Sequence, residues 1–439
     1  MGRLAILDTV AVTGALLPHL PSLHGRTARP LRPPFPAVTS TVQADMLTGA
    51  TPDMHGIVAN GWLHPDLHEI HFWKQSARLL QRPRVWDLLK RHRPGFRTAQ
   101  LFWWFAMGGT ADIVVTPRPQ YRADGSKVPD LHTVPGDLRD TLQQRLGRFP
   151  LFRFWGPLAG IESTRWIAEA TRLVAEQEAP DLLLSYLPHL DYDLQRFGPG
   201  TPEARAACAE LEAVLGPLIR DLEARGYTVW VVNEYGIEAV DRCIPINRIL
   251  REAGLLRVRD EGAGGEHLDL DNSRAFAVAD HQIAHVHHGA DVPLPPIPYT
   301  RAVPMEHPRA GRTVLTAEPG AWFSYDFWLD DARAPDFART VDIHRKPGYD
   351  PRELFSDAGR ASVAWKLARR KLGFAQPLDV VPLNPLIVRG SHGRAPLLRD
   401  NPAELPLWIG GPGDVAEPLD SRGLFGAATR FFGVDPNGL

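Results

Sequence analysis

The stretch Leu4-Ala5-Ile6-Leu7-Asp8 near the start of the chain joins four apolar residues to an aspartate. A short apolar run that ends on a polar residue is typical of a strand buried on both faces of a mainly parallel sheet. Similar runs at residues 181–187 and 227–232 each follow a segment of helical periodicity, at 163–178 and 202–225, and residues 98–105 are a further candidate. Strands that alternate with helices predict an α/β fold, with a mainly parallel central sheet flanked by helices and ligands at the carboxyl ends of the strands.

Residues 255–340 interrupt this alternation with clusters of Gly, Pro and His. They predict either a smaller cap or insertion over the site or an irregular extension of the same sheet. Because no internal repeat is evident, we expect residues 1–439 to form a single domain that contains this segment. A regular helical pattern returns at residues 351–372, before the motif Gly390-Ser391-His392-Gly393.

The composition limits the classes of partner. The chain has 439 residues, 44% of them hydrophobic, and a formal net charge of -2, so no broad basic field favours a nucleic acid polymer or an anionic membrane. A small molecule is the expected partner. Two cysteines cannot build a disulfide framework, the first strand leaves no room for an export signal, and no run of about 18 apolar residues occurs. We therefore expect a cytoplasmic protein without a membrane span; the composition does not determine its oligomeric state.

The most informative segment reads FPAVTS at residues 35–40 and LTGATPDMHGIVAN at residues 47–60. Thr39 lies in the first part of this segment, and Asn60 ends it. A hydroxyl attacks phosphorus at neutral pH only when a metal or a base activates it, and a nearby helix N-terminus helps to hold an anionic substrate. An amide donor such as Asn60 can stabilise a non-bridging oxygen in the transition state. The alternative is structural: Thr39 caps a helix and Asn60 lies in a turn.

The whole segment resembles the signature of the nucleotide pyrophosphatase/phosphodiesterase family of the alkaline phosphatase superfamily, here as a divergent bacterial subgroup. That signature reads F/Y-P-x-x-T, followed by T-G-x-x-P-x-x-H-G-I-x-x-N. The resemblance implies an alkaline-phosphatase-like fold, with Thr39 as the nucleophile and Asn60 as the residue that binds a phosphoryl oxygen.

The resemblance also implies ligands for divalent metal ions at strand ends that lie far apart in the sequence. Asp8, Asp191 and His392 match the family pattern, and Glu234 stands where the family has an aspartate. Two positions depart from it, because Gln195 and Tyr235 occupy places where the family has histidines. The implied metal ligands are therefore Asp8, Thr39, Asp191, Gln195, Glu234, Tyr235 and His392. Zinc prefers nitrogen and sulfur ligands, so the loss of two imidazoles favours weaker zinc binding and one or two ions of zinc, manganese or magnesium.

Other residues have two readings. Trp62 follows Asn60 and could line a pocket for a flat apolar leaving group, although core packing explains most such rings. Lys346 could grip a substrate phosphate or be solvated on the surface. His281, His285 and His287 alternate, so they could form a compensating metal site on one face of a strand, or simply be hydrogen-bonded imidazoles. His55 is expected to support the loop that carries Thr39.

These observations predict a metal-dependent hydrolase of phosphoric diesters or pyrophosphates, an enzyme that acts on a small phosphorylated substrate through Thr39. The first alternative, from Gln195 and Tyr235, is a catalytically degenerate, metal-poor protein that binds a phosphorylated metabolite. The second, from the resemblance alone, is a phosphomonoesterase that acts on a prenyl or sugar phosphate.

Overall fold

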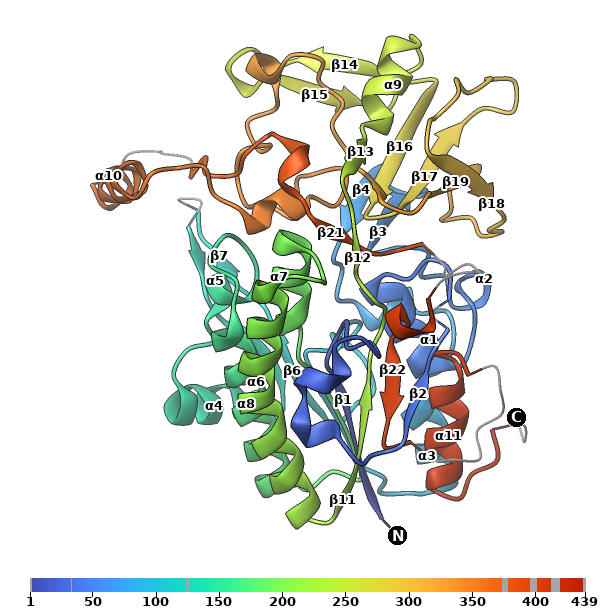
Figure 1. The fold of residues 1–439 in the computed structure, drawn as a ribbon, viewed down its shortest axis with the longest axis vertical. Helices are drawn as coiled ribbons and strands as arrows, with labels where there is room; N and C mark the ends of the chain where they lie inside the picture. Colours follow the sequence, from blue (N-terminus) through green and yellow to red (C-terminus); the bar gives the residue numbers. More distant parts are fainter. Residues whose placement is uncertain are drawn as a thin grey trace.

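The computed structural model describes residues 2–32, 34–123, 126–372, 378–394, 401–411 and 419–436. Its largest sheet has eight strands in the order β2-β22-β11-β1-β10-β5-β6-β9 (Figure 1). Five adjacent strands run parallel, and β2, β22 and β9 extend the two edges through antiparallel pairs. The strands are β1 (Arg3–Asp8), β2 (Ala28–Pro30), β5 (Thr98–Leu101), β6 (Ile113–Pro117), β9 (Leu131–Val134), β10 (Leu182–Tyr186), β11 (Tyr227–Val232) and β22 (Leu407–Ile409).

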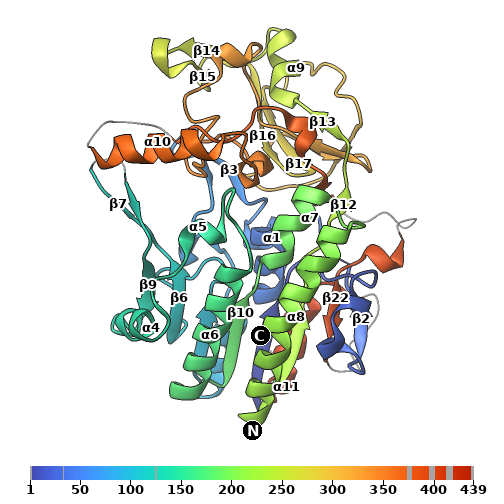
Figure 2. The same ribbon diagram turned by 60° about the vertical axis from the view of Figure 1, so that its left-hand side comes forward.

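Helices cover both faces of this sheet (Figures 1 and 2). One layer contains α6 and α8, and the other contains α1, α3 and α11. Apolar side chains of the strands and of both layers form the main hydrophobic core, in which the residues of β1 are almost completely buried. The helices are α1 (Thr39–Thr48), α3 (Val85–His92), α4 (Leu138–Leu146), α5 (Leu151–Phe154), α6 (Ile161–Gln177), α7 (His189–Phe197), α8 (Pro202–Ala224) and α11 (Gly423–Phe431).

A second lobe lies beyond the carboxyl ends of the parallel strands, at the top of Figure 1. It contains a four-stranded sheet in the order β16-β17-β19-β18 and its own hydrophobic cluster, so residues 255–340 do not extend the main sheet. The hairpin β3–β4 packs against β16. The elements are β3 (Gly61–His64), β4 (Glu69–Phe72), α9 (Ile246–Glu252), β14 (Arg257–Asp260), β15 (Glu266–Asp269), β16 (Ala275–Asp280), β17 (Ile283–His288), β18 (Thr300–Val303) and β19 (Thr313–Ala317).

Most of the predicted elements are present, with two differences. The predicted strand at 98–105 ends at Leu101, after which the chain leaves the sheet edge. The helix predicted over 351–372 is wrong in its middle: a short 3-10 helix (Pro351–Leu354) and α10 (Arg360–Lys371) are separated by Phe355, which is extended. The Asp350 side chain caps the short 3-10 helix, because it accepts a hydrogen bond from the backbone N–H of Arg352. Within the described part of the chain, no helix has the length and apolar character needed to cross a bilayer.

Candidate active site

The candidate nucleophile lies at the first residue of α1. Val38 is extended, Thr39 begins the helix, and Gly49 ends it in the left-handed conformation. The last motif of the chain supports this turn, because His392 Nδ1 donates to the carbonyl oxygen of Ala37 at 2.9 Å. Thr39 is almost fully buried, and its Oγ1 lies 3.0 Å from the hydroxyl of Tyr235. Thr39 therefore lies at a helix N-terminus, where the helix dipole favours an anion.

Two buried carboxylates, Asp8 and Glu234, lie behind Thr39. Asp8 is the last residue of β1 and Glu234 lies just after the neighbouring strand β11, so the parallel register brings their side chains together. Burial raises the pKa of Asp8 to about 7, although hydrogen bonds, including one from Gln43 Nε2 at 3.2 Å, lower it. Burial, and then the charge of Asp8, raise the pKa of Glu234 well above its ordinary value. Like charges this close need a proton or a cation between them.

A second group of side chains surrounds Asp191 on α7. Gln195 Nε2 donates to Asp191 Oδ2 at 2.8 Å, and the Tyr235 hydroxyl donates to Oδ1 at 3.3 Å. Because Tyr235 donates to Asp191, its oxygen remains free to accept the hydrogen of Thr39. His392 Nε2 lies 3.8 Å from Asp191 Oδ1. Burial raises the pKa of Asp191 to about 7, against the effect of these two hydrogen bonds.

The Asn60 side chain anchors the start of α1 to the second lobe. Its Oδ1 accepts from the backbone N–H of Ser40 at 2.9 Å, and its Nδ2 donates to Asp280 Oδ1 at 3.2 Å. The same Asp280 oxygen accepts from His281 Nδ1 at 2.6 Å. One hydrogen of the Asn60 amide group is thus committed to Asp280, and the amide oxygen holds the first turn of α1.

Four rings stack in a row beside Thr39. The ring centroids of Tyr235 and His392 are 3.5 Å apart, those of His392 and His281 3.8 Å, and those of His281 and Tyr349 3.6 Å. Tyr349 also donates its hydroxyl hydrogen to Gln195 Oε1 at 2.9 Å. The stack therefore connects the Asp191 group to the second lobe.

A cavity of about 1660 Å³ opens from this point. Thr39, Asp191, Tyr235 and His392 line its inner end, and much of the remaining wall is aromatic or aliphatic. Asp8, Glu234 and Asn60 are buried and do not line it. The predicted residues scattered from position 8 to position 392 are thus brought together by the fold, with Thr39 between the two carboxylate groups.

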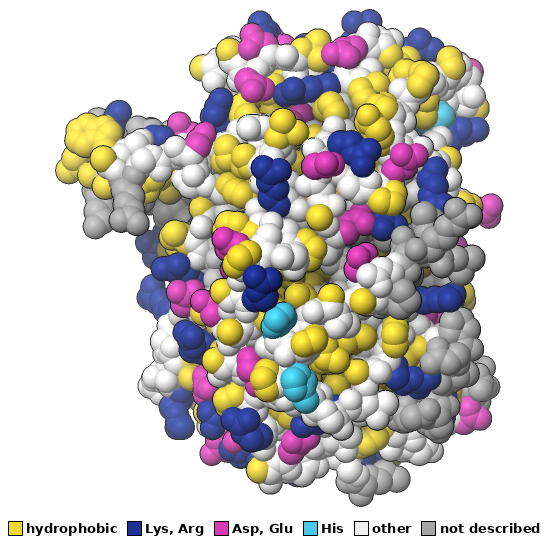
Figure 3. Space-filling model, in the orientation of Figure 1, with side chains coloured by type: hydrophobic (Ala, Val, Ile, Leu, Met, Phe, Trp, Pro, Cys, Tyr) yellow, Lys and Arg dark blue, Asp and Glu magenta, His cyan; other side chains and the backbone are white. Residues whose placement is uncertain are grey.

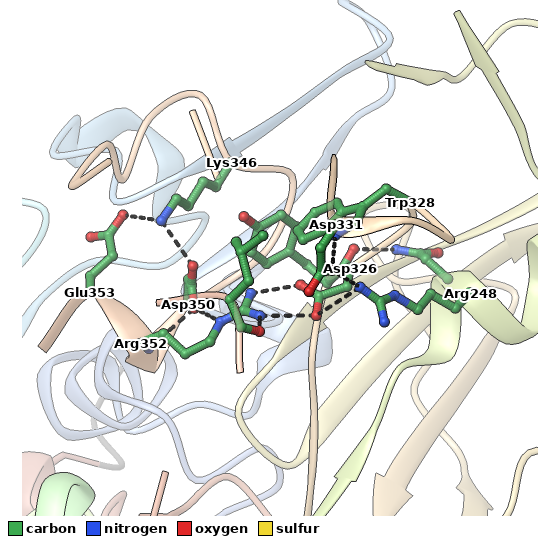
Figure 4. Close-up of polar contacts among 11 residues, drawn as sticks. Arg248, Asp326, Trp328, Asp331, Lys346, Asp350, Arg352 and Glu353 are labelled. Atoms are coloured by element: carbon green, nitrogen blue, oxygen red, sulfur yellow. Dashed lines mark hydrogen bonds and ion pairs between the residues drawn. The ribbon is translucent and has the colours of Figure 1, made fainter. Parts of the chain in front are cut away.

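The structure does not bring Trp62 and Lys346 to this cavity. Trp62 is buried under Arg309, whose guanidinium lies 5.2 Å from the ring centroid. Lys346 is buried in the second lobe, where its Nζ pairs with Asp350 at 2.8 Å and Glu353 at 2.7 Å (Figure 4). A lysine that two buried carboxylates neutralise is not available to bind a phosphate.

The remaining histidines also separate into different roles. His281 precedes β17 and reaches the ring stack. His285 instead bonds to the backbone: its Nε2 donates to the carbonyl oxygen of Val58, and its Nδ1 accepts from the N–H of Gly311. His287 stacks on Phe276. The three imidazoles therefore do not converge. His55 donates to Asp45 of α1 at 2.6 Å, so it supports the helix of Thr39 rather than Thr39 itself.

A cation fits one of the two carboxylate groups. Neither Glu234 oxygen makes a hydrogen bond of normal geometry to the described residues, so a buried carboxylate is left beside Asp8 with its lone pairs free. Both Asp191 oxygens, in contrast, already accept hydrogen bonds, and Gln195 and Tyr235 present hydrogens there. Over the described ranges, no three His, Cys, Asp or Glu side chains gather in the geometry of a metal site. The Asp8–Glu234 pair is oxygen-only, which suits magnesium or manganese.

A family model for type I phosphodiesterase / nucleotide pyrophosphatase matches residues 7–350. The chain belongs to this family. A curated relative, an uncharacterized pyrophosphatase/phosphodiesterase of Schizosaccharomyces pombe, is 26% identical over 215 residues. That match spans 47% of this chain and 37% of the relative, a little over a third of its length.

Solved structures of phosphoester and phosphonate hydrolases share the fold of this family member. Murine ectonucleotide pyrophosphatase/phosphodiesterase 5 superposes with a TM-score of 0.56 at 12% identity, over 98% of this chain and 95% of that chain. Phosphonoacetate hydrolase from Sinorhizobium meliloti 1021 superposes with a TM-score of 0.57 at 14% identity, over the same shares. The predicted alkaline-phosphatase-like α/β fold is confirmed, and so is the prediction of a family of phosphoester hydrolases.

Sequence reasoning missed three residues of the site in this phosphodiesterase-family chain. Gln43 lies one helical turn after Thr39 and holds both Asp8 and the backbone N–H of Trp104. Its spacing of four from Thr39 on a predicted helix was a usable signal. Asp280 and Tyr349 carried no such signal, because Asn60 and Gln195, to which they hydrogen-bond across the site, lie 220 and 154 residues away.

Proposed function

We propose that this protein hydrolyses phosphoric diesters or pyrophosphates, with Thr39 as the nucleophile and one divalent cation held by Asp8 and Glu234. The observation that carries the proposal is the position of Thr39: at a helix N-terminus, on the wall of a large cavity, and directly between two buried acidic groups. A structural helix cap would need neither the cavity nor the carboxylates.

The chain's own residues supply a route for the proton of the nucleophile. Thr39 donates to the Tyr235 oxygen, which in turn donates to Asp191, so the three groups form a hydrogen-bonded line. The Thr39 oxygen forms a bond to phosphorus while its proton passes through Tyr235 to Asp191. The bond from phosphorus to the leaving oxygen breaks, and the leaving oxygen takes this proton from Asp191, which lines the cavity. Water then attacks the phosphothreonine and restores the hydroxyl.

Three features stabilise the phosphoryl group during this exchange. The N-terminus of α1 attracts the anionic group, and Asn60 keeps that turn in place by accepting the N–H of Ser40. The cation, when bound, lowers the pKa of a coordinated hydroxyl and neutralises negative charge on phosphoryl oxygens. The mouse relative has been solved as an inactive threonine-to-alanine variant in complex with AMP. That complex supports a nucleophilic threonine and a small phosphorylated ligand in this chain too.

The test compares Thr39→Ala with Thr41→Val on bis-p-nitrophenyl phosphate, in buffers containing Mn²⁺, Mg²⁺ or Zn²⁺. Thr41 is a matched control, because it is buried on the same helix and its hydroxyl has no partner among the described residues. We expect Thr39→Ala to lose at least about 1000-fold in kcat and Thr41→Val to keep it. Equal hydrolysis by wild type and Thr39→Ala would contradict the proposal.

A second candidate, binding of a phosphorylated metabolite without turnover, is favoured by one observation. Both oxygens of Asp191 are engaged by Gln195 and Tyr235, so the second metal of a two-metal hydrolase has no ligands there. Calorimetry with AMP separates the candidates: binding with no hydrolysis under any of the three cations would favour the binding protein.

A further inference from the structure

The cavity is larger than a nucleotide needs. Pockets for small ligands usually measure about 300–1000 Å³, and this one measures about 1660 Å³. A phosphoryl group on Thr39 and one flat ring beside it leave much of that volume unfilled. The unfilled part must hold another portion of the substrate or water.

Apolar side chains form the wall next to the site. The rings of Trp73 and Trp104 lie 5.0 Å apart, and Trp73 and Trp155 both contact the ring of Tyr349, at 6.1 and 5.8 Å. Leu131 and Phe154 also line the cavity. Water gains little in such a space, because few of these groups can hydrogen-bond to it.

The mouth of the cavity is apolar as well. Phe152 on α5 is 54% exposed and Leu158 in the following loop is 57% exposed, and both line the cavity. Opposite them lies α10, which contributes Val363 and Ala364 to the lining (Figure 2). Hydrophobic side chains cover the end of the projecting α10 arm (Figure 3). Exposed apolar surface around a cavity marks a binding site for apolar ligands or a lipid phase.

The charges on the wall do not favour a polyanion. The lining contains three cationic side chains, of which Arg345 pairs with Asp336 at 2.7 Å and Lys127 lies over the ring of Tyr121. Carboxylates balance the cations along the wall, at Asp130, Asp336 and Asp342. A nucleoside polyphosphate would therefore meet no net positive surface beyond the Thr39 end.

We propose that the substrate is a phosphoric ester that carries one long hydrocarbon chain, with its phosphate at Thr39 and its chain along the Trp73–Trp104–Trp155 wall toward Phe152 and Leu158. The proposal rests on the phosphoester hydrolysis proposed above and specifies its substrate class. Each methylene that leaves water for this wall strengthens binding by roughly fourfold at full burial.

The experiment uses alkyl p-nitrophenyl phosphates that differ only in the alkyl group, butyl or dodecyl, below the micellar concentration. We expect kcat/KM for the dodecyl ester to exceed that for the butyl ester by at least about 100-fold in the wild type. The double variant Phe152→Glu/Leu158→Glu is expected to reduce this ratio at least tenfold. Leu67→Glu is the matched control, because Leu67 is 61% exposed and does not line the cavity; it should leave the ratio unchanged.

A binding measurement separates this proposal from the hydrolase itself. Calorimetry of Thr39→Ala with dodecyl phosphate and butyl phosphate reports chain recognition without turnover. Hydrolysis of both esters at equal kcat/KM, with no tighter binding of dodecyl phosphate, overturns the long-chain substrate and leaves the hydrolase standing. No hydrolysis of any ester, with dodecyl phosphate bound at least about 100-fold more tightly, overturns the hydrolase and supports the chain-binding cavity.

Discussion

Replacing Asp8 by asparagine should make the cation-free protein more stable at pH 8 while abolishing its activity. Asp8 lies against Glu234 in a fully buried site, and its pKa stands near 7 in the fold against an ordinary value of 3.8. Burying two like charges in an active site lowers the free energy of unfolding. A neutral amide of the same shape removes one of the two like charges and keeps an acceptor for the Val10 N–H.

The magnitude follows from proton linkage. A carboxyl whose pKa is raised by folding binds its proton more tightly in the folded chain, so it favours folding most at low pH. That contribution is lost as the pH rises from about 4 to about 7. Since one pKa unit corresponds to about 1.4 kcal/mol, the loss at pH 8 is at most about 4 kcal/mol. We expect the variant to recover about 1–4 kcal/mol of this amount, or a few degrees in Tm.

The assay is urea or thermal unfolding of EDTA-treated protein at pH 5 and pH 8, with and without Mn²⁺. The wild type should be less stable at pH 8 than at pH 5, and Mn²⁺ should restore stability mainly at pH 8, because the cation competes with protons for the pair. The variant should lose both responses and hydrolyse no ester. Asp140→Asn is the control, since that carboxylate is exposed and pairs with Arg139 at the surface; its effect should stay below about 1 kcal/mol.

Two results would refute this reasoning. One is a variant that is destabilised at pH 8 as much as at pH 5, which would mean that the carboxylate pair is not repulsive. The other is a variant that Mn²⁺ still stabilises as strongly as the wild type, which would place the cation elsewhere.

Three further predictions concern the surroundings of the site. Tyr235→Phe should lower kcat about 10–100-fold in a steady-state assay, because it removes the hydroxyl between Thr39 and Asp191. Tyr227→Phe is the control and should keep kcat, because it loses only a buried hydrogen bond to a backbone carbonyl. Equal losses of kcat in the two variants would contradict the proton route. Arg352→Met should lower the free energy of unfolding, measured in urea, by about 3–5 kcal/mol, because two buried carboxylates lose their partner. Arg345→Ala, which removes a half-exposed ion pair, should lower it by less than about 1 kcal/mol. Similar losses in the two variants would show that the buried network in Figure 4 is not coupled. Gly390→Ala should lower kcat/KM at least about tenfold, because the new Cβ would lie 2.1 Å from a backbone oxygen of α7 and push His392 away from Asp191. An unchanged kcat/KM would show that the approach of His392 to Asp191 is not needed.

Much of the site was accessible from the order of residues alone. The strand ending at Asp8 was predicted from an apolar run of four residues, and the helix that begins at Thr39 was implied by the family motif. Because parallel strands end at one edge, Asp8, Asp191 and Glu234 could be placed together before any distance was known. The motif around His392 was also predicted, and it lies 3.8 Å from Asp191.

Other features depended on contacts between distant parts of the chain. Local periodicity favoured one helix over 351–372, but buried ion pairs of Arg352 hold its first turn in a different conformation. Lys346 was predicted either to bind a substrate phosphate or to be solvated on the surface, but the second lobe encloses it with two carboxylates. Trp62 could not be distinguished from a pocket residue until Arg309 was found against its ring.

Local patterns thus determined the α/β architecture and the edge of the sheet at which the acidic residues gather, and the family motif singled out Thr39 as the candidate nucleophile. The tertiary structure alone decided that Tyr235 joins Thr39 to Asp191, that both oxygens of Glu234 lack a hydrogen-bond partner among the described residues, and that an apolar cavity opens beside them. The physical reason is that periodicity and capping act over a few neighbouring residues, whereas burial, hydrogen-bond satisfaction and cavity shape are set by segments up to several hundred positions apart.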